Sequence, residues 1–127
     1  LVGSIYGHGL YPFAEGLNGS HMISVQLPSR SGSEPFREAI ADCWIAALDG
    51  FRPELIYFSA GFDGHREDDM GNLGLVEADY AWATRQVMAV ARRHCQGRVI
   101  SRLEGGYELS ALGRSAAAHI QVLIGAD

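Results

Sequence analysis

The chain has 127 residues, of which 47% are hydrophobic, and carries a formal net charge of −5. This length and apolar fraction fit one domain, residues 1–127, with a moderate core. An acidic chain without clustered Lys and Arg lacks the surface that binds phosphates, so we expect no nucleic-acid partner. The sequence contains no apolar run of membrane-spanning length, so we expect no membrane partner and a cytoplasmic location.

The two cysteines, Cys43 and Cys95, each fall at an apolar position of a helical pattern. This placement is typical of buried free thiols in a reducing compartment. The chain begins on Leu1 rather than on methionine, which is typical of a cut piece or a processed product.

Strands and helices alternate along the chain. Strands are predicted over residues 1–6, 22–27, 55–58 and 98–103, with a long loop from His8 to Gly19 after the first. Helices are predicted from Ser33, as N-cap, to Gly50, and over residues 76–94 and 109–124. Strands separated by helices of this length predict parallel crossovers, and therefore an α/β sandwich of three layers with a mainly parallel sheet.

One of these strands runs straight into a glycine-flanked acidic loop, which we take as Gly61–Gly71. The apolar run Leu55–Phe58 is typical of a strand that helices cover on both faces. In parallel sheets of this kind, ligands lie just beyond the carboxyl ends of the strands. Asp63 lies there, and Gly61 and Gly64 allow the backbone to turn sharply around it.

Tyr107 follows the last predicted strand and the pair Gly105-Gly106. If the two strands are near neighbours, their loops bring Asp63 and Tyr107 to one edge of the sheet. A carboxylate at a strand end has two structural interpretations, an N-cap or a turn residue, and one functional interpretation, a metal ligand. A tyrosine after two glycines is usually a packing residue. The functional interpretation of Tyr107 is a phenol that donates a hydrogen bond to a developing oxyanion.

Two motifs resemble those of a known family. Ser59-Ala-Gly-Phe-Asp-Gly-His-Arg-Glu-Asp68 and Leu103-Glu-Gly-Gly-Tyr-Glu-Leu109 are similar to the C-terminal signatures of the zinc-dependent histone deacetylases and their bacterial relatives, the acetylpolyamine and acetoin-utilisation deacetylases. The likeness extends through Ser4–Pro12 and Gln26–Pro28, and so over nearly the whole chain. It implies the C-terminal half of the arginase/deacetylase fold and an activity on acetylated lysine or acetylated amines.

Carried over by position, the resemblance implies that Asp63 is one aspartate ligand of a catalytic zinc and that Tyr107 polarises the substrate carbonyl. Gly105 and Gly106 match the hinge of that tyrosine, and Gly61 lies in the first signature. The family's Asp-x-His ligands and its His-His pair precede the part matched here, and neither occurs upstream in this chain. Zinc is therefore expected to bind weakly or not at all to this chain alone.

Asp63-Gly64-His65 also has the Asp-x-His pattern, but it lies at a position where the family's histidine is not a ligand. One such pair also supplies fewer than the three protein ligands that a catalytic zinc needs. His119 lies on an apolar helical face and is expected to be packed rather than catalytic. The remaining histidines, His8, His21 and His94, are scattered along the chain.

The sequence also departs from the family pattern. The family's aspartate-proline is Asp68-Asp69 here, which predicts a looser and more negatively charged turn. Ser101 and Arg102 replace apolar residues of a central strand, which predicts a less well covered face.

Two functional hypotheses remain. In the first, the chain is the C-terminal portion of a zinc-dependent amide hydrolase and is inactive in isolation. In the second, it is a truncated α/β protein that folds and oligomerises without catalysis. A half domain leaves an apolar surface and an open sheet edge, which predicts a homo-oligomer formed through residues 1–6, residues 22–27 and the helix carrying Phe36 and Trp44.

Overall fold

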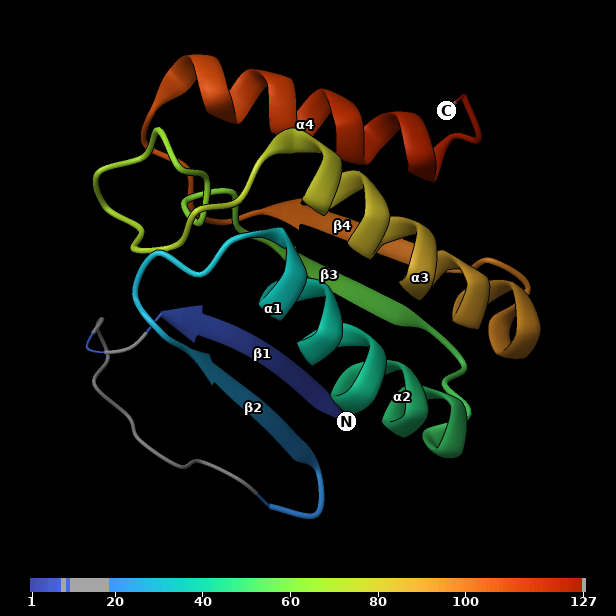
Figure 1. Ribbon diagram of the computed structural model, residues 1–127. Coiled ribbons are helices and arrows are strands. Elements are labelled where there is room, and N and C mark those ends of the chain that lie inside the picture. The colour runs from blue at the N-terminus through green and yellow to red at the C-terminus, as the bar shows by residue number, and fades with distance from the viewer. Residues whose placement is uncertain (8, 10–18, 127) are drawn as a thin grey trace.

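A computed structural model describes residues 1–7, 9 and 19–126 (Figure 1). Of the predicted loop from His8 to Gly19, only Gly9 and Gly19 are among these residues, and His8 lies outside them. The elements in chain order are β1 (Val2–Gly7), β2 (Met22–Leu27), α1 (Ser33–Ala39), the π-helical segment η1 (Ile40–Ile45), α2 (Ala46–Phe51), β3 (Ile56–Ala60), α3 (Glu77–Cys95), β4 (Val99–Leu103) and α4 (Leu109–Leu123). Among the described residues, no helix is both long enough and apolar enough to cross a membrane.

The predicted helix from Ser33 forms as a continuous run through α1, η1 and α2. Its start differs by one residue from the prediction, because Gly32 is the N-cap and Ser33 is already helical. The Ser33 hydroxyl instead donates to Asp79 Oδ2 of α3 at 2.8 Å, so this side chain joins two helices rather than capping one. The run ends at Phe51, one residue beyond the predicted Gly50, where Arg52 takes a left-handed φ of 54°.

The strands form two parallel pairs. β1 pairs with β2, and β3 pairs with β4, as two separate two-stranded sheets. All four strands run in the same direction, so their carboxyl ends lie at the left in Figure 1, beside the acidic loop. The α/β class with parallel strands is therefore confirmed.

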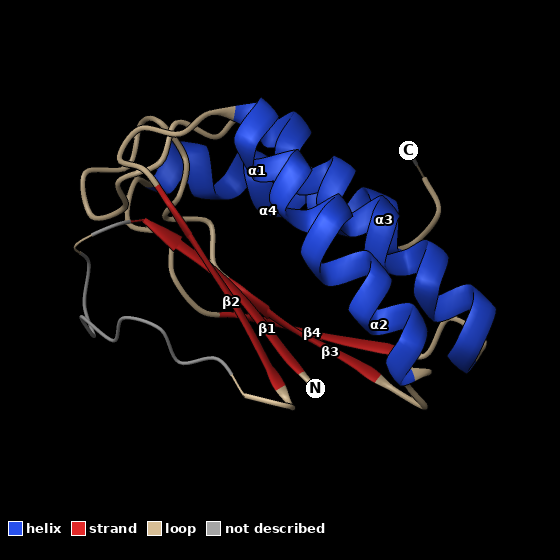
Figure 2. Ribbon diagram, turned by 60° about the horizontal axis from the view of Figure 1, so that its bottom comes forward, coloured by secondary structure: helices blue, strands red, loops and turns tan. Residues whose placement is uncertain are grey.

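The helices of the described chain cover only one face of the strands (Figure 2). On β3, Ile56 faces the helices and is 8% exposed, whereas Tyr57 on the opposite face is 54% exposed. Leu55, just before the strand, is also exposed. The prediction that Leu55–Phe58 is buried on both faces is therefore wrong for the described chain, because no second helical layer is present among these residues. Ser101 and Arg102 are both exposed, and they point to opposite faces of β4, with Ser101 toward α4 and Arg102 on the uncovered face.

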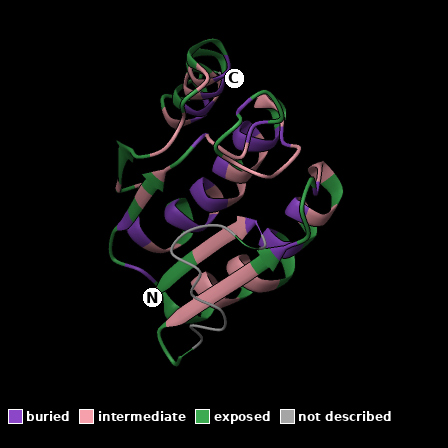
Figure 3. Cartoon of the chain, turned by 90° about the vertical axis from the view of Figure 1, so that its left-hand side faces the viewer, coloured by how far each residue is buried: buried purple, intermediate pink, exposed green. Residues whose placement is uncertain are grey.

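The core lies between the helices and the strands, and Figure 3 shows the buried residues gathered mainly on the helices. Its largest cluster joins Phe36 and Ile40 to Leu27 and to residues of the acidic loop and α3. Phe36, which lies on the helix of the predicted self-association surface, is 8% exposed and packs within its own chain. Both cysteines are free thiols, as predicted: Cys95 is fully buried and Cys43 half-buried.

Truncation of Ile40 tests this core. Ile40 is 0% exposed, so Ile40→Ala should lower the free energy of unfolding by about 2–5 kcal/mol through lost contacts and the cavity left behind. Ile120 is 51% exposed on α4, and Ile120→Ala should change stability by less than about 0.5 kcal/mol. Urea denaturation measures both variants. Equal losses would contradict the assigned core.

Candidate active-site edge

The parallel ladder of β3 and β4 brings Asp63 and Tyr107 to the same edge of the sheet. Asp63 follows the end of β3, and Tyr107 follows the end of β4, its hydrogen-bonded neighbour. Backbone hydrogen bonds continue beyond the strands, from Glu104 N to Ala60 O at 2.9 Å and from Phe62 N to the carbonyl oxygen of Gly105 at 2.8 Å. The two loops are therefore joined directly, and the predicted convergence of Asp63 and Tyr107 on one edge is confirmed.

Asp63 lies in a cradle of glycines. A Cβ atom on Gly105 would lie 2.8 Å from Asp63 Cγ, and one on Gly61 would lie 3.2 Å from Asp63 Oδ1. A Cβ on Gly71 would lie only 1.6 Å from the main-chain oxygen of Asp63. Gly71 was not identified from the sequence, because its contact with Asp63 depends on how the acidic loop closes on itself.

The electrostatic surroundings of Asp63 disfavour its negative charge. Burial raises the pKa of its carboxyl above the ordinary value, and the neighbouring charge of Asp68 raises it further. A cation beside Asp63 would counter both effects. Asp63 is half-buried, and it belongs to no group of three candidate metal ligands among the described residues.

Asp68 ties the acidic loop to the Tyr107 turn. Its Oδ2 accepts hydrogen bonds from Tyr107 N at 2.6 Å and Glu108 N at 3.0 Å, and its Oδ1 accepts one from Met70 N at 2.9 Å. Burial alone would raise the pKa of Asp68, but these backbone donors together with that of Gly71 outweigh it and lower the pKa. The looser turn predicted at Asp68-Asp69 is therefore wrong, because Asp68 is held by these bonds.

The side chain of Tyr107 is 60% exposed, so its phenol is accessible at this edge. The preceding Gly106 has a φ of 138°, which side-chain-bearing residues rarely adopt. A Cβ on Gly106 would also lie 2.7 Å from Leu112 Cδ1. The glycine pair therefore permits both the turn and its close packing on α4.

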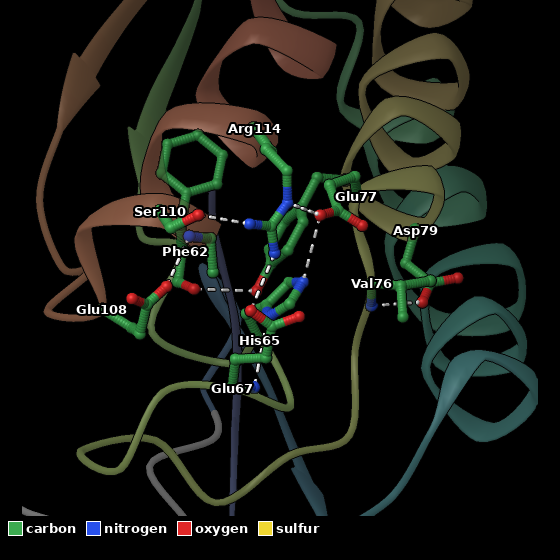
Figure 4. A network of polar contacts seen from close by, with 11 residues as sticks. Phe62, His65, Glu67, Val76, Glu77, Asp79, Glu108, Ser110 and Arg114 are labelled. Carbon is green, nitrogen blue, oxygen red and sulfur yellow. Dashed lines mark hydrogen bonds and ion pairs between the residues drawn. The ribbon is translucent and has the colours of Figure 1, made fainter.

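A network around Arg114 of α4 supports the acidic loop from outside (Figure 4). The Arg114 guanidinium forms ion pairs with Glu77 at the start of α3 and with Glu67 of the loop, and it donates to Ser110. Its hydrogen bond to Glu77 lowers the pKa of that carboxyl to about 2. The network joins α4, α3 and the loop, and Arg114 carried no signal in the sequence that would have identified it.

His65 belongs to the same network (Figure 4). It is 1% exposed, its Nδ1 accepts from Glu67 N at 3.1 Å, and its Nε2 lies 3.5 Å from Glu77 Oε1. The buried Nε2 thus approaches the Glu77 carboxylate but forms no hydrogen bond within the described residues. Both ring nitrogens therefore face protein groups.

His119 is packed, as its helical face predicted. It is 5% exposed between the rings of Phe58 and Phe62, and burial lowers its pKa. Its Nδ1 lies 2.7 Å from Thr84 Oγ1 and its Nε2 2.8 Å from Ser101 Oγ. These contacts join α4 to α3 and β4.

The described part of the chain does not form a complete metal site. No group of three His, Cys, Asp or Glu side chains that could hold a metal ion occurs among residues 1–7, 9 and 19–126. A catalytic zinc takes three protein ligands, so the described residues alone do not fit this ion.

Fold and site together define an α/β protein with a carboxylate and an accessible phenol at the carboxyl edge of parallel strands. The family model of the histone deacetylase domain matches residues 1–123 of the sequence, so the chain belongs to this family.

Individual relatives agree with this assignment. The chain is 39% identical to type-2 histone deacetylase 1 of Dictyostelium discoideum over 103 residues. This alignment covers 81% of this chain and 7% of that protein. It is 34% identical over 89 residues to a probable deacetylase of Archaeoglobus fulgidus, covering 70% of this chain and 25% of the relative. The crystal structure of the HDA15 HD domain superposes with a TM-score of 0.83 at 29% identity, over 98% of this chain and 37% of that one.

The chain thus spans a quarter or less of these two curated relatives. It corresponds to a part of a deacetylase domain.

Substitution of Gly71 tests the cradle around Asp63. Gly71→Ala would force a Cβ onto the Asp63 backbone and should lower the free energy of unfolding by about 1–3 kcal/mol. Gly113, within α4, has open space around it, and Gly113→Ala should raise stability by about 0.5–1 kcal/mol through helix propensity. Thermal and urea unfolding measure both. A neutral Gly71→Ala variant would show that the loop does not close on Asp63.

Proposed function

We propose that the chain is the C-terminal portion of a zinc-dependent deacetylase that acts on acetylated lysine or acetylated amines, and that it is inactive in isolation. The observation that carries this proposal is the single edge at which Asp63 and Tyr107 meet, within a chain of the histone deacetylase family. In this proposal Tyr107 donates a hydrogen bond to the substrate carbonyl oxygen, and Asp63 contributes one ligand to a zinc whose other ligands lie outside residues 1–127.

A groove between the two strand pairs supports the need for further protein. Two cavities of about 450 and 470 Å³ are lined by residues of both β1 and β3. Trp44 lines both cavities, and within the described part of the chain its buried Nε1 has no hydrogen-bond partner. We propose that an extended segment of the missing part enters this groove, pairs with the facing strand edges and provides an acceptor for Trp44.

A fusion protein tests the proposed function. Residues 1–127 would be joined to the part of the HDA15 HD domain that precedes its matched region, and zinc content and hydrolysis of an acetyl-lysine peptide would be measured on the same samples. The 127-residue chain should retain no stoichiometric zinc after dialysis and show no turnover. The fusion should show both.

Two substitutions in the fusion separate the roles. Asp63→Ala should remove zinc, and Tyr107→Phe should keep zinc but lower kcat by about 10²–10³-fold, because one oxyanion donor is lost. Asp69→Ala and Tyr57→Phe are matched controls at exposed positions and should leave both readouts unchanged. Zinc retained by the isolated chain, or full turnover by the Tyr107→Phe fusion, would contradict the proposal.

We also propose that the isolated chain forms a homo-oligomer in the cytoplasm through the uncovered strand face. Tyr57 and Ile100, which are cross-strand neighbours, are 54% and 49% exposed on this face. Burying such a face against its copy across a two-fold axis would remove apolar surface from water.

Sedimentation velocity tests this self-association. Tyr57→Lys with Ile100→Lys should shift the chain towards the monomer, whereas Met70→Lys, at a 63% exposed loop position, should not. A compact monomer of the unsubstituted chain at all concentrations would contradict the proposal.

A further inference from the structure

We infer that Asp68 is a positioning residue that fixes Tyr107 relative to the loop of Asp63. The inference rests on the proposed function of Tyr107 as the carbonyl-polarising phenol. Asp68 contacts Tyr107 through the backbone N–H of that residue, and its effect on the phenol is therefore indirect.

The carboxylate of Asp68 is used entirely for backbone groups. Asp68 is 6% exposed, and its Oδ2 receives the N–H groups of two successive residues, Tyr107 and Glu108. Its Oδ1 receives the N–H of Met70 in its own loop. Charge-assisted bonds of this kind are shorter and about twice as strong as neutral ones, and the 2.6 Å bond to Tyr107 N is the shortest of the three.

The turn before Tyr107 needs such an anchor. Gly105 and Gly106 precede the tyrosine, and glycine loses more conformational freedom on ordering than any other residue. The Tyr107 side chain is mostly exposed, so its own packing does little to hold the turn. Asp68 supplies the restraint at the residue where the glycine hinge ends.

Asp68 is itself held in place. Its N–H donates to His65 O at 2.9 Å, and Arg66 N donates to Leu75 O at 2.9 Å, so the acidic loop is bonded along its length. On the other side, the Glu108 side chain accepts from Ala111 N at 2.6 Å and caps α4. Tyr107 is therefore fixed between the loop that carries Asp63 and the first turn of α4.

Amide hydrogen exchange on the ¹⁵N-labelled 127-residue chain tests the inference. Asp68→Ala should accelerate exchange at Tyr107 and Glu108 by about 10–100-fold, and Asp68→Asn by less, since an amide oxygen still accepts hydrogen bonds but lacks the negative charge that strengthens them. The Tyr107 amide proton should also move upfield. Exchange at Val87 and Val90 in α3 should stay unchanged in Asp68→Asn, which preserves the shape of the side chain.

Asp69→Asn is the matched control, because Asp69 is the adjacent exposed aspartate, and it should leave the Tyr107 and Glu108 amides unchanged. Unchanged exchange at Tyr107 in Asp68→Asn, or equal acceleration throughout α3, would overturn the inference. These readouts decide it whether or not the proposed deacetylase activity is found.

In the fusion protein, Asp68→Asn should lower kcat by about tenfold or more while KM and zinc content stay near their original values, because the phenol is misplaced and Asp63 is not. Loss of zinc in this variant would assign Asp68 to the metal site instead and overturn the positioning role.

Discussion

The parallel hydrogen-bonded ladder between β3 and β4 is the constraint on which the candidate site depends. It aligns Ala60 with Leu103, so the two strands end side by side and their loops begin at the same point in space. The bond from Phe62 N to Gly105 O then carries the pairing past the strands. A Cβ at Gly105 would lie within 3 Å of the Asp63 carboxylate, so a larger residue there would displace that side chain. The closeness of the loops therefore follows from backbone pairing, and Asp68 and Arg114 add the side-chain contacts that fix them.

The same strands explain why the site is partial. Parallel sheets ordinarily carry helices on both faces, yet the described chain covers one face and leaves the facing edges of β1 and β3 without a shared ladder. A cavity separates these edges, and the buried Trp44 indole N–H has no acceptor among the described residues. This arrangement agrees with a chain that covers 37% of the HDA15 HD domain structure. The incomplete sheet and the single metal-ligand candidate both agree with a chain that matches only part of a larger domain.

The sequence predicted those features that are set by local pattern. The positions of the strands and helices, the parallel α/β class and the meeting of Asp63 with Tyr107 follow from apolar periodicity and strand order. It failed where contacts between distant residues decide the outcome. The carboxylate of Asp68 reaches Tyr107 across 39 positions, and Arg114 reaches Glu67 across 47. Ser33 is a residue type that favours the N-cap position, but here it is the first helical residue and its hydroxyl donates to Asp79 of α3. The exposure of Tyr57 was also beyond prediction, since an apolar strand pattern does not show which covering layer is present.

The central claim is that residues 1–127 contribute one carboxylate and one phenol to a zinc site completed by other protein. Anomalous diffraction at the zinc edge, on crystals of the fusion with the preceding part of the HDA15 HD domain, tests it most directly. The account predicts one zinc peak beside the Asp63 carboxylate, ligands from the added part, and the Tyr107 hydroxyl facing the same space. A zinc peak that no atom of residues 1–127 approaches, or a Tyr107 turned to the opposite side of the sheet edge, would contradict it.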